Sequence, residues 1–311
     1  MAALAVVIIL SLLPTPYVIV TPGSAVNLSE AVTVEGYAPP VDRFFLTDVS
    51  VQRATALSLL GGFLPGAHVF RAENFVPRGM STTLYDRRLA DAMAESENNA
   101  AVVAERAAGF HVPDVPARMV VTAILSSSRA GDSLRAGDEI VRLNGQRVTT
   151  LAEIARLVSG THVGAPIAVR IRRNGSALEL RVPTVRISGA PRLGIVVERS
   201  EPAPPLPVSV RYSLGNIGGS SGGLMLALQI YSTLRGNRRH PGTSIAGTGT
   251  LASDGTVGPI EGTQQKLIAA KRAGATIFLV PRENLADVAG EHDVRIVPVR
   301  SFRDALATLP S

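Results

Sequence analysis

The sequence predicts an α/β (α+β) fold that includes a separate β-rich domain. Beyond the stiff connector 202–207 (PAPPLP), strand and helix patterns alternate to the carboxyl end, as in an α/β domain. Between residues 112 and 188, short apolar runs flank the Asn144-Gly145 dipeptide, a strong short-range signal for a β-hairpin. The 311 residues, 46% of them hydrophobic, suffice for two domains with cores of their own.

Residues 1–20 form an uncharged and almost wholly apolar run. About 18 apolar residues in a helix can cross a bilayer, although Pro14 and Pro16 end a regular helix near Leu13. We predict that residues 1–20 anchor a single-pass protein in the cell membrane, with the rest of the chain on the extracytoplasmic side. The alternative is a buried first strand.

The remaining elements follow from hydrophobic periodicity and turn residues. A helix over Leu89–Ala108 has apolar residues at helical spacing and ends before Gly109, which suits a carboxyl cap. The other predicted helices cover 151–158, the segment after Gly223, 263–273 and 302–309. The predicted strands cover 43–51, 119–125, 138–143, 167–172, 177–182, 208–212, 276–281 and 294–299.

The composition argues against several classes of function. The net charge of +6 comes from scattered arginines without interleaved aromatic residues, so we predict no nucleic-acid partner. The absence of cysteine rules out a thiol nucleophile and a disulfide framework. The five histidines are isolated in sequence and form no metal-binding motif, so we predict neither a metal nor a cofactor.

The segment 216–232 (NIGGSSGGLMLALQIYS) places glycines and two adjacent serines directly before an apolar helix. A phosphate-binding loop would need lysine where Leu224 stands, and no dinucleotide fingerprint fits these glycines. The remaining hypotheses are a serine helix cap and a serine nucleophile. For a nucleophile, backbone N–H groups around Gly219, Ser220 and Gly222 would stabilise an oxyanion at the helix start.

Lysine is rare in this chain, because only Lys266 and Lys271 are lysines among 31 basic residues. Arginine cannot replace lysine where an amine must lose its proton, since the guanidinium stays charged. On a helix, Lys266 shares a strip with Ala269, Ala270 and Ala273, which predicts burial and a lowered pKa. Such an amine can accept the proton of a serine hydroxyl.

Residues 112–188 resemble a PDZ domain of the bacterial protease type. The pattern L-x-x-G-D-x-I-x-x-x-N-G is matched by Leu134, Gly137, Asp138, Ile140, Asn144 and Gly145. The resemblance implies a module that binds extended polypeptide ends along a sheet edge. The segment 116–119 stands where a glycine-containing carboxylate loop is usual, so the alternative is a spacer or a gate.

Further motifs resemble the proteolytic domain of Lon-type proteases, which are Ser-Lys endopeptidases. They are Met93-Ala94-Glu95-Ser96, Ser220-Ser221-Gly222-Gly223, Thr248-Gly249-Thr250-Leu251, and Pro259-Ile260-Glu261-Gly262 with Lys266-Leu267. By this resemblance Ser221 is the nucleophile, Lys266 the general base and Thr248 the hydroxyl that orients the lysine amine. Ser220, Gly222 and Glu261 depart from the family pattern, which leaves Ser220 as an alternative nucleophile.

The resemblance also implies a protease domain in two parts, residues 31–111 and 192–311, with the PDZ-like domain 112–188 inserted between them. Anchor, protease and PDZ together resemble the membrane-anchored, PDZ-containing Lon-like proteases of bacteria. A homo-oligomer with a hexamer-like ring follows from the same resemblance.

We therefore predict an ATP-independent serine endopeptidase, since no ATPase motif is present. Its substrates would be extracytoplasmic or membrane-associated polypeptides, which the PDZ-like domain would engage or gate. Two rivals remain. One is a Ser-His-Asp hydrolase that uses His240 and Asp254, and the other is a catalytically inactive, membrane-tethered PDZ adaptor.

Overall fold

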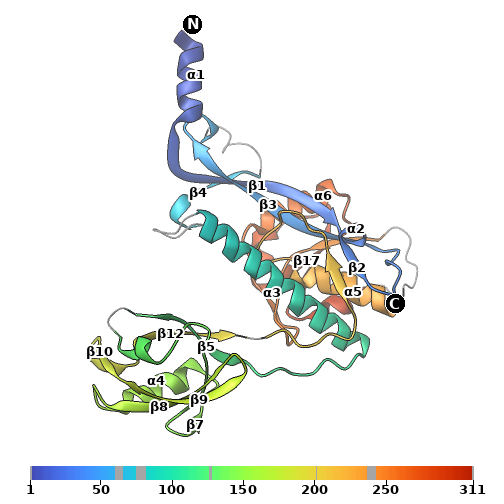
Figure 1. Cartoon of the computed structure of the whole chain (residues 1–311). Coiled ribbons are helices and arrows are strands. Elements are labelled where there is room, and N and C mark those ends of the chain that lie inside the picture. Colours follow the sequence, from blue (N-terminus) through green and yellow to red (C-terminus); the bar gives the residue numbers. More distant parts are fainter. Residues whose placement is uncertain are drawn as a thin grey trace. The chain divides into compact units, whose positions relative to one another are not determined.

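The computed structural model describes residues 2–59, 66–74, 82–125, 128–200, 202–236 and 243–309. The chain forms two compact units. The first unit joins Met1–Val112 with Pro205–Ser311, and the second comprises Pro113–Pro204. The chain therefore leaves the first unit after Val112, builds the second unit completely, and then returns (Figure 1).

The amino-terminal run, predicted as one anchor over residues 1–20, is divided between a helix and a strand. Helix α1 (Ala2–Leu12) ends just before Pro14, and strand β1 (Pro14–Asn27) follows it (Figure 1). Proline lacks the N–H that a continued helix would need. Within β1, residues 18–20 are buried in the sheet. Among the described residues, no helix combines the length and the hydropathy needed to cross a membrane.

A six-stranded sheet forms the middle of the first unit, in the order β18-β17-β14-β3-β1-β4 (Figure 1). Besides β1, its strands are β3 (Arg43–Thr55), β4 (His68–Arg71), β14 (Ser244–Gly247), β17 (Ile277–Pro281) and β18 (Arg295–Val299). Strands β18, β17, β14 and β3 run parallel, whereas β1 pairs antiparallel with β3 and β4. The register sets Gly247 beside Leu46 of β3 and Leu279 of β17.

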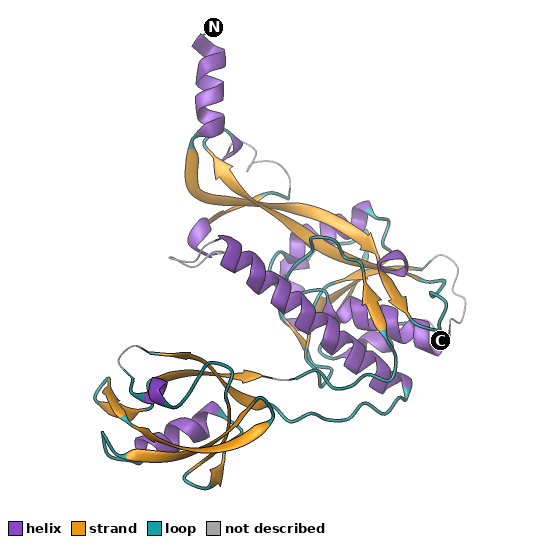
Figure 2. Cartoon of the chain, in the orientation of Figure 1, coloured by secondary structure: helices purple, strands orange, loops and turns teal. Residues whose placement is uncertain are grey.

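Helices cover both faces of this sheet (Figure 2). On one face, α3 (Thr82–Ala108) and α5 (Gly223–Arg235) share a core with Phe44, Leu46 and Leu279. On the other face, α6 (Thr263–Arg272) packs against β1 and β3, over a core that contains Phe45 and Phe278. Because side chains alternate along a strand, neighbouring residues such as Phe44 and Phe45 enter different cores. A strand buried on both faces reads as a continuous apolar run, as β17 does.

Smaller elements complete the first unit. They are α2 (Leu28–Ala31), β2 (Val32–Val34), η2 (Ala72–Asn74), β13 (Val210–Tyr212), β15 (Thr250–Leu251), β16 (Val257–Gly258), η4 (Arg282–Val288) and α7 (Phe302–Leu306). Strand β13 pairs with β2, and β15 pairs with β16. Strand β15 follows shortly after β14 and contacts α5, whose first turn is bonded to Gly249 through the N–H of Leu224.

The second unit is built on a sheet in the order β12-β5-β6-β8-β9, with β7 paired to β6 (strands β5, β7, β8, β9 and β12 are labelled in Figure 1). Its elements are β5 (Arg118–Ile124), η3 (Ala130–Asp132), β6 (Glu139–Leu143), β7 (Gln146–Arg147), α4 (Leu151–Ser159), β8 (Pro166–Arg173), β9 (Ser176–Pro183), β10 (Val185–Ile187), β11 (Ala190–Arg192) and β12 (Ile195–Ser200). Asn144 and Gly145, with φ of 46° and 79°, form the predicted turn from β6 into β7. The unit extends past residue 188 because β12 pairs with β5.

Candidate active site

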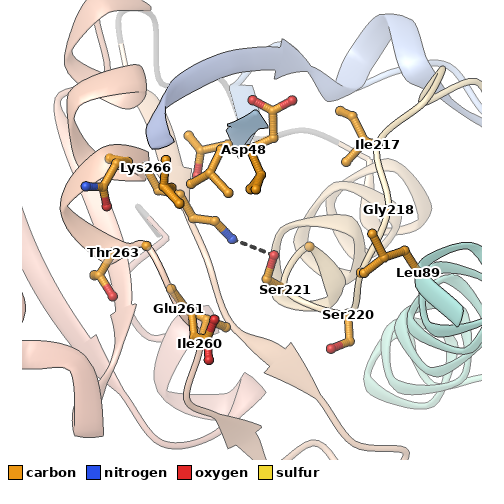
Figure 3. A pocket seen from close by; sticks show the side chains of 18 of the residues that line it. Asp48, Leu89, Ile217, Gly218, Ser220, Ser221, Ile260, Glu261, Thr263 and Lys266 are labelled. Carbon is orange, nitrogen blue, oxygen red and sulfur yellow. Dashed lines mark hydrogen bonds between the residues drawn. The ribbon is translucent and has the colours of Figure 1, made fainter. Parts of the chain in front are cut away.

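Ser221 lies at the start of α5, in the glycine-rich loop. Gly222 is the N-cap of the helix, and Gly219 adopts a left-handed φ of 90° that a side chain would disfavour. The Oγ of Ser221 accepts a hydrogen bond of 2.5 Å from Lys266 Nζ (Figure 3). Ser220 is exposed, and its side chain points away from Lys266 (Figure 3). The lysine therefore contacts Ser221 and not Ser220.

Lys266 also contacts a second hydroxyl group. Its Nζ donates to Thr248 Oγ1 at 3.1 Å, and Thr248 Oγ1 in turn donates to the carbonyl oxygen of Ser221 at 3.1 Å. The N–H of Gly249 donates to the same carbonyl at 2.9 Å. These bonds fix both the direction of the lysine amine and the loop that carries the serine.

The end of strand β14 explains how residues from opposite faces of the sheet meet. Ser221 belongs to the α5 side and Lys266 to the α6 side. Thr248 directly follows β14, where its N–H donates to the carbonyl of Leu279 at 3.0 Å. Beyond this point β14 no longer separates the two faces, so the lysine reaches the serine. Sites in open α/β sheets commonly lie at the carboxyl ends of parallel strands.

Burial gives Lys266 the properties of a base. The residue is 3% exposed, and Thr248 is fully buried. Burial lowers the pKa of Lys266 to about 8, while the negative charge of Asp48 opposes part of that shift. An amine with a pKa near neutrality is partly unprotonated in the physiological range and can accept a proton from a hydroxyl.

A groove of about 1150 Å³ opens over Ser221 and Lys266. Tyr85, Leu89 and Met93 of α3 line it together with the loop 216–222, and the segment 259–266 lines it as well. Small-molecule sites usually measure roughly 300 to 1,000 Å³. This groove is larger, which suits a polypeptide segment.

Two contacts from α3 hold the serine loop. The N–H of Gly219 donates to the carbonyl of Leu89 at 2.8 Å, and Ser96 Oγ donates to the carbonyl of Ser220 at 3.1 Å. The N–H of Gly219, predicted as an oxyanion donor, is therefore already occupied. Over the described residues, the N–H groups of Ser221 and Gly222 meet no protein acceptor. These two groups are the donors that an oxyanion could use.

Two stretches of the chain are similar to known protein families. Residues 215–306 match the Lon protease (S16) C-terminal proteolytic domain, and residues 96–184 match the PDZ domain. The chain carries a PDZ domain and a Lon-type proteolytic domain. The Lon protease of Campylobacter concisus is 38% identical over 95 residues, which cover 28% of this chain and 11% of that protein. Lon protease 2 of Herpetosiphon aurantiacus is 30% identical over 171 residues, 54% of this chain and 18% of that protein. The chain thus spans less than a fifth of the length of these relatives.

Two solved structures from Listeria are similar to the PDZ domain. The PDZ domain of an SdrC-like protein from Listeria monocytogenes is 20% identical with a TM-score of 0.25, and covers 28% of this chain and 93% of that one. The corresponding domain from Listeria innocua is 21% identical with a TM-score of 0.25, and covers 26% of this chain and 92% of that one.

The stretch matched by the Lon-type domain includes Ser221, Thr248 and Lys266, which the structure brings together. Of the rival triad, His240 lies outside the described residues, while Asp254 accepts a hydrogen bond from the N–H of Thr256 in its own turn. Among the described residues, no cluster of His, Cys, Asp and Glu could hold a metal ion. Among the described residues, the network at Ser221 has the parts of a catalytic site.

Asp48 belongs to this site, although the sequence reasoning did not single it out. The residue lies in β3, and both the N–H and the Oγ of Ser24 donate to its carboxylate. Ser24 stands where β1 bulges against β3, between Pro22 and Ala25. The available signal was a lone carboxylate inside the predicted strand 43–51.

We expect Asp48→Asn to move the alkaline rise of the cleavage rate to lower pH. The negative charge of Asp48 raises the pKa of Lys266, so its removal lowers that pKa and the neutral amine forms at lower pH. The asparagine Oδ1 can still accept from Ser24, which preserves the bulge. The measurement is kcat/KM for peptide cleavage from about pH 6 to pH 10. Glu35→Gln, a change at an exposed residue outside the groove, serves as the control. An unmoved midpoint in Asp48→Asn contradicts the assignment.

We expect Gly222→Ala to destabilise the fold through Leu46. A Cβ on Gly222 would lie 2.6 Å from Leu46 Cδ1, and Leu46 is only 2% exposed. Such overpacking typically costs about 1–3 kcal/mol. Leu46→Val removes the clashing methyl group, so the double variant should be more stable than the sum of the two single changes by at least about 1 kcal/mol. Urea unfolding of the four proteins checks this, and strict additivity contradicts it.

In the PDZ domain, a glycine-containing turn beside an edge strand lies away from the segment 116–119, where the sequence comparison expected the carboxylate loop. Arg118 and Met119, within the segment 116–119, lie in β5, which is an inner strand between β12 and β6. Strand β12 is one of the two edge strands, next to β5, and contacts α4. Gly194, with φ of 68°, precedes it at a point where a Cβ would lie 2.6 Å from the Cβ of Ser128. The glycine-containing turn thus comes from residues beyond the matched stretch 96–184.

Proposed function

We propose that this protein is a serine endopeptidase with a Ser221-Lys266 dyad. The observation that carries the proposal is the contact of a buried lysine amine with Ser221 Oγ and Thr248 Oγ1 at the floor of a large groove. The similarity of residues 215–306 to the Lon protease proteolytic domain supports the same reaction class.

In the acylation step, the neutral Lys266 Nζ accepts the proton of Ser221 Oγ while that oxygen attacks the carbonyl carbon of the scissile bond. The carbonyl oxygen gains the negative charge, which the N–H groups of Ser221 and Gly222 stabilise at the positive end of α5. When the C–N bond breaks, the protonated Lys266 returns its proton to the departing amine.

In the deacylation step, Lys266 accepts a proton from water, whose oxygen attacks the acyl carbon. The C–O bond to Ser221 then breaks, and the serine oxygen regains the proton from Lys266. Thr248 takes part by position, because its hydroxyl accepts from the lysine amine and donates to the backbone of Ser221. The amine is thereby kept aimed at Oγ through both steps.

We propose further that cleavage needs no ATP, because the sequence contains no ATPase motif. The test is to incubate the purified full chain with denatured casein, with and without magnesium ATP, and to identify the products by mass spectrometry. We expect the same cleavage in both samples. A higher turnover with ATP contradicts the proposal.

The rival of an inactive PDZ adaptor is tested separately. A fluorophosphonate probe reacts with a serine whose hydroxyl is activated by a neighbouring base. We expect labelling of the wild-type protein that disappears in Ser221→Ala. A wild-type protein without labelling and without cleavage supports the adaptor.

The PDZ domain is proposed to bind substrate at the outer edge of β12. An edge strand beside a helix, opened by a glycine turn, can accept an extended polypeptide as an additional strand. The substitution Val197→Pro, in β12, should weaken the binding of unfolded polypeptide to the full chain. Labelling of Ser221 by the fluorophosphonate probe should persist in this variant. Unchanged binding favours a spacer role.

Membrane association on the extracytoplasmic side is proposed through α1. Its side chains of Leu4, Ile9 and Leu12 are 61–74% exposed, and Met1–Ser29 carry no charge. An exposed apolar helix of this kind gains free energy by entering a bilayer interface. Sedimentation with phospholipid vesicles tests it, with Ile9→Glu as the variant that should stay unbound.

The ring-shaped homo-oligomer and the absence of a nucleic-acid partner stay predictions, which light scattering and a DNA-binding assay check.

A further inference from the structure

The groove over the dyad is lined by more negative than positive groups, although the chain as a whole is basic. Three carboxylates line it, from Asp48, Glu261 and Asp287, and its basic groups are Lys266 and His68. The whole chain carries a formal net charge of +6. A groove that reverses the charge of its protein favours ligands with positive charge.

Glu261 differs from the other two carboxylates because no described residue pairs with it. Asp48 accepts from Ser24, and Asp287 accepts from Thr263 Oγ1 and Asn284 Nδ2 at 2.9 and 2.8 Å. For Glu261, in contrast, no hydrogen bond or ion pair occurs within the part of the chain that the structure describes. An unpaired carboxylate beside a nucleophile is available to a substrate.

The backbone under Glu261 is held firmly. The N–H of Ile260 donates to Asn284 Oδ1 at 2.9 Å, and Asn284 Nδ2 donates to the carbonyl of Ile260 at 2.9 Å. On the other side, Gly262 adopts a left-handed φ of 73° and is the N-cap of α6, which carries Lys266. The backbone position of Glu261 relative to the lysine is therefore set by one short, hydrogen-bonded segment. A backbone held in place keeps the carboxylate within the reach of one side chain from the dyad.

The charge of Glu261 acts into the groove. In the view of Figure 3, Glu261 and Asp48 lie on either side of the Ser221-Lys266 pair. Tyr85 lines the groove from α3, and its pKa is raised by burial first and then by the negative charge of Glu261. A polypeptide bound over Ser221 would pass between these groups.

We propose that Glu261 selects substrates with a lysine or arginine side chain at one position within about three residues of the scissile bond. The inference rests on the proposed endopeptidase function and adds its substrate preference. A charge-assisted hydrogen bond from an ammonium or guanidinium group to the Glu261 carboxylate stabilises the bound basic substrate. An acidic side chain at the same position meets repulsion, so discrimination has both an attractive and a repulsive part.

The first test is the pattern of cleavage sites in denatured casein digested by the wild-type protein. We expect lysine and arginine to be enriched at one fixed position within about three residues of the scissile bond, since successive residues of an extended chain are about 3.3 Å apart. Cleavage sites without such enrichment overturn the inference while leaving the endopeptidase function standing. Absence of any cleavage that depends on Ser221 refutes the function itself, and this inference with it.

The second test compares matched peptides that carry lysine, norleucine or glutamate at that position. The wild-type kcat/KM should favour lysine over norleucine by roughly tenfold. In Glu261→Gln this ratio should fall to about one, and in Glu261→Arg the glutamate peptide should be preferred. Glu283→Gln, an exposed carboxylate outside the groove lining, is the matched control and should keep the ratio. A lysine preference that persists in Glu261→Gln overturns the inference.

Discussion

Ser221→Ala is expected to lower kcat/KM for an unfolded polypeptide by at least about a thousandfold. The alanine has no Oγ to attack the scissile carbonyl or to accept the hydrogen bond from Lys266 Nζ. Any residual rate would come from substrate binding and the oxyanion donors alone. The measurement is the initial rate of casein cleavage, with the products identified by mass spectrometry.

Ser220→Ala is the matched control for that experiment, because it removes a neighbouring hydroxyl from the same loop. The side chain of Ser220 is exposed, and the loop contact from Ser96 Oγ uses its backbone carbonyl, which alanine retains. We expect a loss far smaller than that of Ser221→Ala. Equal losses in the two variants would indicate damage to the loop, and a larger loss in Ser220→Ala would make Ser220 the nucleophile.

The sequence predicted the parts of the site that have local signals. Ser221 directly precedes two glycines at a helix start, and Lys266 is one of two lysines in a chain rich in arginine. Both signals arise from chemistry, because a nucleophile needs an open backbone and a base needs a group that can lose its proton. That they face each other depends on the parallel pairing of β14, which no local pattern reports.

Features that depend on pairing between distant segments escaped prediction. The apolar run at residues 14–20 is consistent with both an anchor and a strand, and the pairing that places it in a sheet is with the distant segments β3 and β4. The carboxylate of Asp48 is held by Ser24, which stands in a bulge of β1. Strand β12 joins the PDZ sheet by pairing with β5, which lies far from it in the sequence. Hydrophobic periodicity identifies elements, whereas register and edge position are properties of the folded sheet.

Lys266→Arg is expected to lower kcat/KM almost as far as Ser221→Ala, because arginine keeps the positive charge but cannot accept the serine proton. In the wild type, the reactive form is the neutral amine, whose fraction grows as pH rises through the Lys266 pKa of about 8. The wild-type rate should therefore rise with pH through that value and then level off, and the Arg variant should show no such rise. Lys271→Arg is the matched control on the same helix, since Lys271 is ion-paired with Glu291 and Asp293 at the surface. Equal rates in wild type and Lys266→Arg would contradict the dyad.

Stability distinguishes a lost base from a damaged fold at this position. The pKa of Lys266 is about 8 in the folded protein against 10.5 for a free lysine side chain, so between these values the unfolded chain binds more protons and stability rises with pH. Below about pH 8 the folded state bears the full cost of a buried charge, on the order of 3 kcal/mol.

Lys266→Met keeps the side-chain volume without the charge, so at pH 7 it should be inactive yet more stable than the wild type. The difference in the free energy of unfolding should shrink as pH approaches 10.5. Urea unfolding at pH 7 and near pH 10 measures this difference. A Met variant that is less stable than the wild type at pH 7 would mean that the Lys266 amine stabilises the fold. It would contradict the view that the buried amine destabilises the fold and serves catalysis.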